Sequence, residues 1–308
     1  MTDFFIVDVF SVDRYTGNQL AVFLNGHTYN TEQMQTLARE MHFSETTFIM
    51  QSAEEIAQQD TTVLIIPVRI FTPASEIPFA GHPTLGTAFV VQQQLIQHPI
   101  ETLSLQMSGG LIPVQFTYHN AQPYLLTMTQ NQPVFGAIID KHDMAKCLNL
   151  SIDAFNEQYP VQIVSTGLPF IIVALKQRED VQKAWVQLQV LQSLAPQVEP
   201  DANILVFAMD PIDEDNDVHV RVFVPELGVS EDPATGSANG CLCAFLLRYP
   251  VPEENTARAT HSLTLRVEQG YAIDRPSLLY LNGKRVNDLY DIRVGGSVHF
   301  VARAELLG

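Results

Sequence analysis

The chain has 308 residues, of which 46% are hydrophobic and 17% are charged. This composition excludes intrinsic disorder and provides enough apolar side chains for a core, and the length predicts two domains. The formal net charge is -17, from 17 Lys and Arg against 34 Asp and Glu. A field of that sign repels nucleic acid and anionic membrane surfaces, so we expect neither as a partner.

Three cysteines, Cys147, Cys241 and Cys243, are too few and too closely spaced to predict a disulfide framework. Cys241 and Cys243 stand in an apolar run, so we expect buried small side chains and no metal site. The N-terminus lacks the basic and apolar regions of a signal peptide, and no run of about 18 apolar residues marks a membrane span. These features predict a cytoplasmic protein.

In chain order, the first half consists mostly of short strands. Strand-like runs at 4–10 and 20–24 flank a polar turn, and apolar residues recur with helical spacing over 31–41. A β-branched run over 62–71 predicts a long strand, and the segment 83–95 predicts a helix that is apolar almost all round. Three more strand-like runs follow this helix: TLSLQM, LIPVQFTY and YLLTM.

The second half repeats this style. Its strand-like runs are VQIVS, FIIVAL, NILVFAM, VHVRVFV, LTLRV, SLLYLN and SVHFVARAEL. The acidic stretch 210–217 is typical of a solvated loop, and 237–247 predicts a second helix that is apolar on nearly every side. Two buried helices among many strands predict an α+β fold of two pseudo-symmetric halves. Each half is a mostly antiparallel β-sheet or barrel wrapped around a central α-helix.

An internal repeat supports a duplicated fold. The segments 69–91 and 221–247 each read Arg, aliphatic, Phe, any residue and Pro, followed by a polar loop with an acid and a Pro. Each then has a Gly followed by a polar residue that opens an apolar helix, Gly81-His82 in the first copy and Gly236-Ser237 in the second. A shared order of five features indicates duplication of one structural unit.

The polar stretch around 127–137 marks a plausible boundary between the halves. We expect an N-terminal half over residues 1–130, which the last strand, about 297–308, can complete. The C-terminal half then covers residues 131–296.

The two helix starts are the places where we expect chemistry. The first amide N–H groups of a helix have no partner inside it and carry about half a positive charge, so they bind anions. Gly81 and Gly236 let a ligand approach the backbone closely. Two such starts facing each other would hold a carboxylate despite the negative net charge. In the alternative interpretation both loops are plain helix caps, for which Ser is a favoured residue.

Three polar side chains are candidates for proton chemistry. Glu45 lies between Ser44 and a Thr pair, and is either a surface residue at a strand start or an acid in a pocket. In a pocket, burial and a bound anion would raise its pKa, so that it can take and return a proton. Asp232 either serves in such chemistry or caps its own loop. His82 opens a helix, where the dipole disfavours its charged form, so we expect a neutral ring.

Six segments spread over most of the chain closely resemble the phenazine-biosynthesis PhzF-like family. They are VDVFSVDRYTGNQLAVFL (7–24), FSETTFI (43–49), FTPASEIPFAGHPTLGTAFV (71–90), STGLPF (165–170), VSEDPATGSANG (229–240) and VEQGYAIDRPS (267–277). The GHPTLG and EDPATGSA blocks are long and specific.

The resemblance implies a diaminopimelate-epimerase-like fold with the site between the halves, a homodimer and no cofactor. The family's best-understood member isomerises a dihydro-hydroxyanthranilate by moving a proton with a Glu, which falls on Glu45 here. The other functional positions of the family fall on His82, Asp232 and Ser237. Related racemases place a Cys at each helix start, where this chain has His82 and Ser237, so we do not expect racemisation by two thiols. The resemblance leaves the substrate open.

Three functions remain as hypotheses. The leading one is a cofactor-independent isomerase acting on a small anionic metabolite, with Glu45, His82, Asp232 and Ser237 as catalytic residues. Gly81, Gly236 and Asn18 are its candidate substrate-binding residues. The second is hydrolysis by Ser237, His82 and Asp232, although no G-x-S-x-G sequence surrounds this serine. The third is a dimer without catalytic activity that binds a metabolite or another protein.

Overall fold

The computed structural model describes residues 3–59, 64–194, 203–225, 229–249 and 262–306. Its contacts divide the chain into two compact units. Unit 1 comprises Met1–Thr129 and Gly295–Gly308, and unit 2 comprises Gln130–Val294. The first unit therefore contains both ends of the chain.

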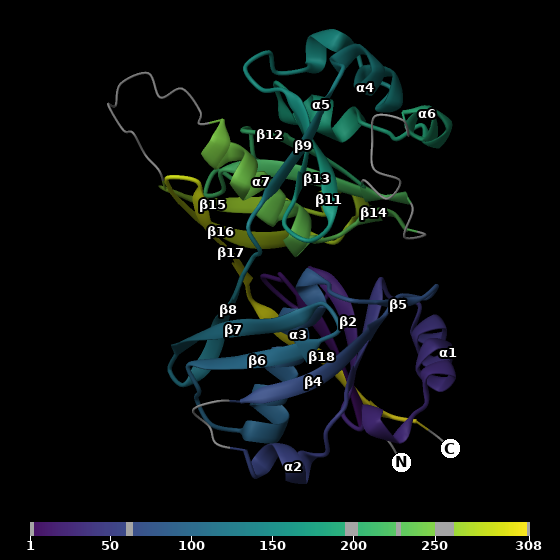
Figure 1. The fold of residues 1–308 in the computed structure, drawn as a ribbon, viewed down its shortest axis with the longest axis vertical. Coiled ribbons are helices and arrows are strands. Elements are labelled where there is room, and N and C mark those ends of the chain that lie inside the picture. Colours follow the sequence, from purple (N-terminus) through teal and green to yellow (C-terminus); the bar gives the residue numbers. More distant parts are fainter. Residues whose placement is uncertain (1–2, 60–63, 195–202, 226–228, 250–261, 307–308) are drawn as a thin grey trace. The chain divides into compact units, whose positions relative to one another are not determined.

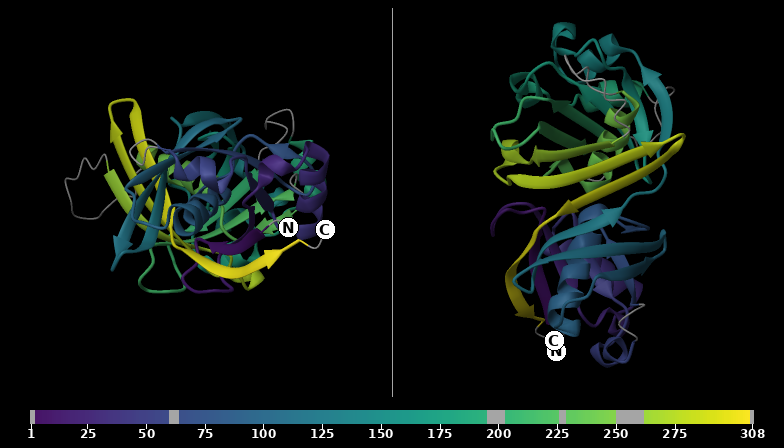
Figure 2. Two further views of the ribbon diagram at one scale, coloured as in Figure 1. Left: turned by 90° about the horizontal axis from the view of Figure 1, so that it is seen from below. Right: turned by 90° about the vertical axis from the view of Figure 1, so that its left-hand side faces the viewer.

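Unit 1 is a sheet wrapped around one helix. Its strands are β1 (Asp3–Val9), β2 (Asn18–Phe23), β3 (Glu45–Ile49), β4 (Ile65–Phe71), β5 (Glu76–Ile77), β6 (Thr102–Met107), β7 (Gly110–His119), β8 (Gln122–Thr129) and β18 (Val298–Glu305). The pairs β2–β3 and β4–β6 are parallel. The pairs β1–β2, β1–β18, β3–β4, β4–β5, β6–β7 and β7–β8 are antiparallel. β1 and β18 lie side by side, so the two ends of the chain complete one sheet (Figure 2).

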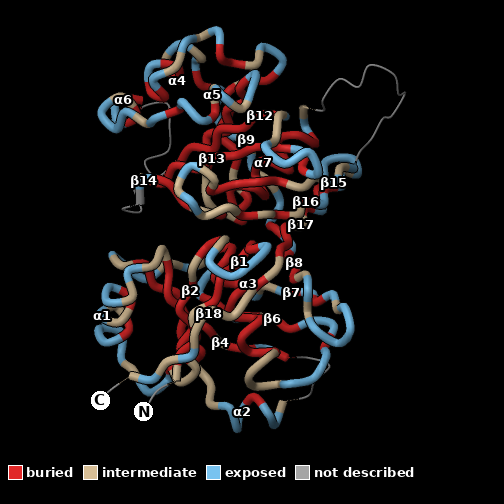
Figure 3. Tube along the Cα trace, turned by 180° about the vertical axis from the view of Figure 1, so that it is seen from behind, coloured by how far each residue is buried: buried red, intermediate tan, exposed pale blue. Residues whose placement is uncertain are grey.

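The central helix of unit 1 is α3 (Gly81–Val90), which continues as a π-helical segment over Val91–Ile96. Every residue of α3 is buried, as expected for a helix that is apolar on all sides (Figure 3). Gly86 permits this close packing, since a Cβ there would lie 2.6 Å from Leu20 Cδ2 and 2.8 Å from Val9 Cγ2. Two more helices, α1 (Thr31–Met41) and α2 (Ala53–Ala57), lie outside the sheet (Figure 1).

Unit 2 repeats the arrangement. Its strands are β9 (Val134–Ile139), β10 (Val161–Ser165), β11 (Pro169–Ala174), β12 (Asn203–Ala208), β13 (Val218–Val224), β14 (Val229–Asp232), β15 (Ser262–Gln269), β16 (Ser277–Val286) and β17 (Leu289–Gly296). The parallel pairs are again β11–β12 and β13–β15, in the places that β2–β3 and β4–β6 occupy in unit 1. The chain passes between the units twice. After β8 it enters unit 2, where β9 pairs with β10, and after β17 it returns to unit 1, where β18 pairs with β1.

The central helix of unit 2 is α7 (Gly236–Arg248), which is buried at every position except Arg248. Three short helices, α4 (Lys141–Cys147), α5 (Arg178–Lys183) and α6 (Leu188–Ser193), pack against strands β9 to β13 in one apolar cluster (Figure 1). Cys241 and Cys243 lie inside α7, and burial raises the pKa of each to about 12, so they are packing residues.

These observations confirm the predicted α+β class with two similar halves around central helices. The predicted helix 31–41 matches α1, and 237–247 falls within α7. Residues 62–63 of the predicted strand 62–71 lie outside the described residues, and residues 65–71 form β4. The sequence analysis did not predict α2, α4, α5 or α6, because five to seven residues are too short for an apolar stripe.

Candidate functional site

Glu45 is the first residue of β3, whose five residues are all buried. The strand lies between β2 and β4, and Leu20 of β2 is its neighbour in the parallel register. Thr46 and Thr47 suit this position because β-branched side chains pack well on a pleated sheet. Only 8% of Glu45 is exposed, so the carboxyl is an acid held inside the unit and is not a surface residue of a strand.

His82, the second residue of α3, meets Glu45 inside unit 1. Its Nε2 atom lies 3.4 Å from Glu45 Oε2, and its Nδ1 atom lies 3.2 Å from the side-chain nitrogen of Asn18. The three residues come from three elements, α3, β3 and β2, that are distant in sequence and adjacent in the fold. The structure therefore brings together Asn18, His82 and Glu45.

The ring of His82 is neutral at neutral pH. Burial lowers its pKa to about 3, and a hydrogen bond with the backbone of Gln19 acts in the opposite direction without offsetting it. The sequence analysis expected a neutral ring from the helix dipole, but desolvation is the larger cause. When the Asn18 amide donates to Nδ1, the ring proton lies on Nε2 and faces the Glu45 carboxylate.

Asp232 and Ser237 lie at the start of the central helix of unit 2. Asp232 ends β14, and its Oδ2 atom accepts a hydrogen bond of 2.6 Å from the hydroxyl of Thr235. Ser237 is the second residue of α7, and both Asp232 and Ser237 are buried. Unit 2 thus places one carboxylate and one hydroxyl at the start of its central helix.

The sequence repeat is a repeat in structure. Arg69 pairs with Glu76 in unit 1 at 2.7 and 2.6 Å, and Arg221 pairs with Glu231 in unit 2 at 3.0 and 2.8 Å. Each guanidinium also lies over a Phe two residues later. Gly81 and Gly236 follow the paired glutamates at the same spacing. By this alignment His82 corresponds to Ser237, and Ile77 corresponds to Asp232.

Neither helix start is a plain side-chain cap. Gly81 and Gly236 are the first residues of α3 and α7, and the N-cap residues are Ala80 and Thr235. Ala80 has no capping group, and the Thr235 side chain makes no cap hydrogen bond. Ser237 is inside the helix and not at the N-cap, so the capping interpretation of Ser237 does not apply. Amide groups at a helix start attract anions.

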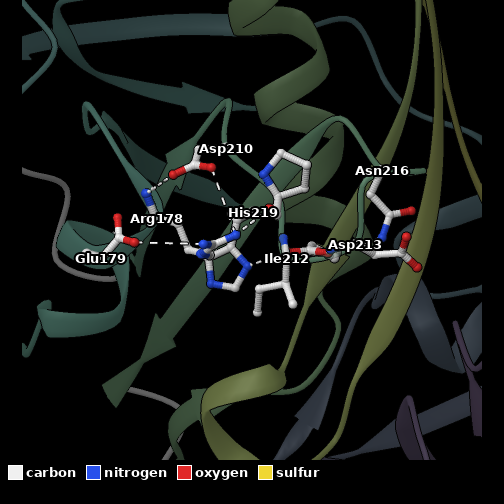
Figure 4. Close-up of polar contacts among 9 residues, drawn as sticks. Arg178, Glu179, Asp210, Ile212, Asp213, Asn216 and His219 are labelled. Atoms are coloured by element: carbon white, nitrogen blue, oxygen red, sulfur yellow. Dashed lines mark hydrogen bonds and ion pairs between the residues drawn. The ribbon is translucent and has the colours of Figure 1, made fainter.

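Sequence reasoning missed a buried polar network in unit 2. The Glu268 carboxylate accepts hydrogen bonds from the backbone N–H groups of Ile212 and Asp213, from Asn216, and from His219 at 2.8 Å. Figure 4 shows the loop residues Asp210, Ile212, Asp213 and Asn216 together with His219. Glu268 therefore holds the acidic stretch 210–217 through these hydrogen bonds, although most side chains of the stretch face solvent. The sequence VEQG (267–270) contributes to the family resemblance, but its pattern does not indicate this burial.

Within the described residues, no three His, Cys, Asp or Glu side chains come together in a way that could hold a metal ion. The described part of the chain also has no helix of the length and hydropathy needed to cross a membrane.

Comparison with known proteins gives consistent results. The sequence pattern of the phenazine biosynthesis-like proteins (PhzC-PhzF) matches residues 7–303. An uncharacterised isomerase of Clostridium acetobutylicum is 30% identical, with 98% of this chain and 96% of the relative covered. Trans-2,3-dihydro-3-hydroxyanthranilate isomerase of Pseudomonas fluorescens is also 30% identical, with 96% of both chains covered. A PhzF-family protein of Bacillus anthracis has a similar structure, with a TM-score of 0.86, 26% identity and 99% coverage of both chains.

Proposed function

The chain belongs to the phenazine biosynthesis-like family of isomerases, and from that premise we propose that Glu45 moves a proton on a small carboxylate-bearing metabolite without a cofactor. The observation that supports this most directly is the buried carboxyl of Glu45 beside the neutral imidazole of His82, at 3.4 Å. A carboxyl withdrawn from water and next to a second proton carrier is suited to general acid–base catalysis.

The proposed reaction conserves atoms and electrons. Glu45 takes a proton from a carbon of the substrate, the electron pair of the broken C–H bond forms a new double bond, and the pair of the adjacent double bond shifts to the carbon that is protonated next. The carboxyl then returns the proton to a different carbon, so the product is an isomer and no oxidant or reductant is needed. Between these steps Glu45 is a neutral carboxylic acid. In the tautomer that accepts from Asn18, Nε2–H of His82 would stabilise the carboxylate form of Glu45 before the first step and after the second.

We propose that the helix starts hold the substrate. The first amides of α3 and α7, at Gly81 and Gly236, would bind its carboxylate, and each such donor can stabilise a transition state by about 3 kcal/mol. Asp232 and Ser237 would position the substrate or relay protons. Asn18 orients His82 through its hydrogen bond and so acts through this ring.

The Pseudomonas fluorescens relative is named for a dihydro-hydroxyanthranilate, a cyclic carboxylate. We therefore propose small unsaturated or cyclic carboxylates as the substrate class, which does not imply phenazine synthesis. We also propose that the protein is a cytoplasmic homodimer, as the family resemblance implies. Light scattering during size-exclusion chromatography would test the dimer.

The experiment is deuterium incorporation from solvent. A panel of small carboxylates that includes trans-2,3-dihydro-3-hydroxyanthranilate is first screened by thermal shift. Stabilising compounds are then incubated with the protein in D2O and followed by proton NMR. We expect carbon-bound deuterium with the wild type, and a loss of about 10²- to 10⁴-fold in rate with Glu45→Gln while the thermal shift persists.

Glu40→Gln on the surface of the α1 helix is the matched control, since it makes the same chemical change at an exposed site. A stabilising carboxylate that gains no deuterium would contradict the isomerase in favour of a binding protein. Unchanged incorporation in Glu45→Gln would contradict the role of this carboxyl.

A further inference from the structure

The amide of Gln269, at the end of β15, is fully buried and makes four hydrogen bonds to the segment that enters α7 and to the beginning of α7 itself. Its Oε1 atom accepts from the backbone N–H of Thr235 at 3.2 Å and from Asn239 at 2.9 Å. Its Nε2 atom donates to the backbone carbonyl of Asp232 at 2.8 Å and to the Thr235 hydroxyl at 3.1 Å. One side chain therefore holds both ends of the segment Asp232–Thr235.

These contacts set the direction of the Thr235 hydroxyl. The backbone N–H of Thr235 needs an acceptor and the carbonyl of Asp232 needs a donor, which fixes the orientation of the Gln269 amide. Its nitrogen can only donate, so the Thr235 oxygen accepts from it. The single hydroxyl proton is then directed to Asp232 Oδ2, 2.6 Å away. A chain of donors runs from Gln269 through Thr235 to the carboxylate.

The duplicated frame of unit 1 allows an internal comparison. Ile66 of β4 pairs with Leu105, and Val218 of β13 pairs with Val267. Ile66 and Val218 each lie three residues before the repeated arginine, so the partner strands are in the same register. Two residues along those partner strands, unit 1 has Met107 where unit 2 has Gln269.

Neighbouring positions also differ between the two units. Thr84 of unit 1 contacts the sulfur of Met107 at 4.0 Å, where Asn239 of unit 2 contacts Gln269. The loop of unit 1 carries Ile77 where unit 2 carries the carboxylate. The fold therefore accepts an apolar residue at this place, and the amide accompanies Asp232.

We propose that Gln269 is a positioning residue that fixes Asp232 and directs the Thr235 hydroxyl onto it. This rests on the proposed function, because it assumes that Asp232 takes part in the proton chemistry. Gln269 itself is buried behind the loop and acts through Thr235 and Asp232. Without the amide, the N–H of Thr235 and the carbonyl of Asp232 lose this partner, and the hydroxyl can rotate away from the carboxylate.

Two sets of variants test the inference. Gln269→Met introduces the residue of unit 1, with Met107→Leu in unit 1 as its control. Thr235→Val removes the half-buried hydroxyl at nearly constant volume, and Thr235→Ser restores it. If Gln269→Met fails to fold, the Thr235 pair still tests the donor chain, because Thr235 is only partly buried.

The first measurement needs no ligand. Hydrogen–deuterium exchange followed by mass spectrometry reports on the peptide that contains Asp232–Ser237. We expect Gln269→Met to exchange at least about tenfold faster in this peptide, and Met107→Leu to leave it unchanged. Unchanged exchange in folded Gln269→Met would overturn the inference, whether or not the protein is an isomerase.

The second measurement is deuterium incorporation into the carboxylate selected by thermal shift. We expect Gln269→Met and Thr235→Val to lower kcat at least about tenfold with little change in KM, and Thr235→Ser to remain near the wild type. A purely structural role would give no rescue by Ser. Wild-type kcat in both Gln269→Met and Thr235→Val would overturn the inference. Absence of incorporation by the wild type would instead contradict the proposed function, and hydrogen exchange would then decide the role of Gln269.

Discussion

Acid should destabilise this fold through His82, and the size of the effect follows from its burial. The pKa of the ring is lowered to about 3 in the folded protein, against 6.5 in an unfolded chain. Between these values the unfolded state binds a proton that the folded state does not bind. The free energy of unfolding therefore falls as the pH drops below 6.5, and this loss is complete below about pH 3.

At pH 5 the protonated form of the unfolded ring exceeds the neutral form by a factor of about 10^1.5. The free energy of unfolding is therefore lower by about 2 kcal/mol than at a pH where the unfolded ring is neutral. His82→Gln removes the titrating group and should remove this part of the pH dependence. The assay is urea unfolding of both proteins at pH 8 and at pH 5, from which the four free energies are compared. The exposed His142→Gln is the control and should retain the wild-type dependence.

The result that refutes this reasoning is an equal pH dependence in the wild type and in His82→Gln. It would mean that the buried ring accepts a proton in the folded protein, where an ion pair with Glu45 at 3.4 Å would stabilise it. The experiment thus shows whether burial or the neighbouring carboxylate determines the protonation state of the His82 ring in the folded protein.

Three further predictions concern single residues. Burial alone would raise the pKa of Glu268, but hydrogen bonds from His219 and from the 210–217 loop lower it. Glu268→Gln should therefore lower the free energy of unfolding by about 2–4 kcal/mol at pH 7. Urea unfolding should show this difference from the wild type shrinking as the pH falls below about 4.5. Gly86→Ala should lower the unfolding free energy by about 1–2 kcal/mol, although helix propensity alone predicts a gain, because its Cβ would meet β1 and β2 side chains at 2.8 Å or less. Ser237 should resist a fluorophosphonate probe in mass spectrometry, because it is buried in α7, and labelling would revive the hydrolase hypothesis.

The central helices were predictable because their sequences are apolar on every side, and only burial within a sheet explains such a pattern. The repeat was predictable because its Arg, Phe and Gly residues have the same structural roles in both units: an Arg–Glu pair, a guanidinium over a Phe ring and a glycine as the first residue of the central helix. The burial of Glu45 was not predictable from its position, since a carboxylate at a strand start is usually exposed. The partner of His82 depends on three elements meeting in space, which local sequence does not encode.

Gln269 and Glu268 were missed for a related reason. Both are polar residues at the end of a strand, where sequence patterns indicate solvent exposure. Their burial becomes visible only through the hydrogen bonds that satisfy them, from the 210–217 loop for Glu268 and from Asp232–Thr235 for Gln269. Buried polar groups that are fully hydrogen-bonded cost little, so composition gives no warning of them.

The two units differ in the polar residues at their central helices, and these differences bear on the type of reaction. The frames agree in their Arg–Glu pairs and glycine-first helices, yet Glu45 begins β3 where Asn203 begins the equivalent β12. His82 likewise corresponds to Ser237. A racemase exchanges the roles of its acid and base when it runs backwards, so it benefits from two chemically equivalent groups. This chain has a buried carboxyl–imidazole pair in one unit and a hydroxyl-bound carboxylate in the other, which favours migration of a proton between unlike positions over inversion of a single carbon.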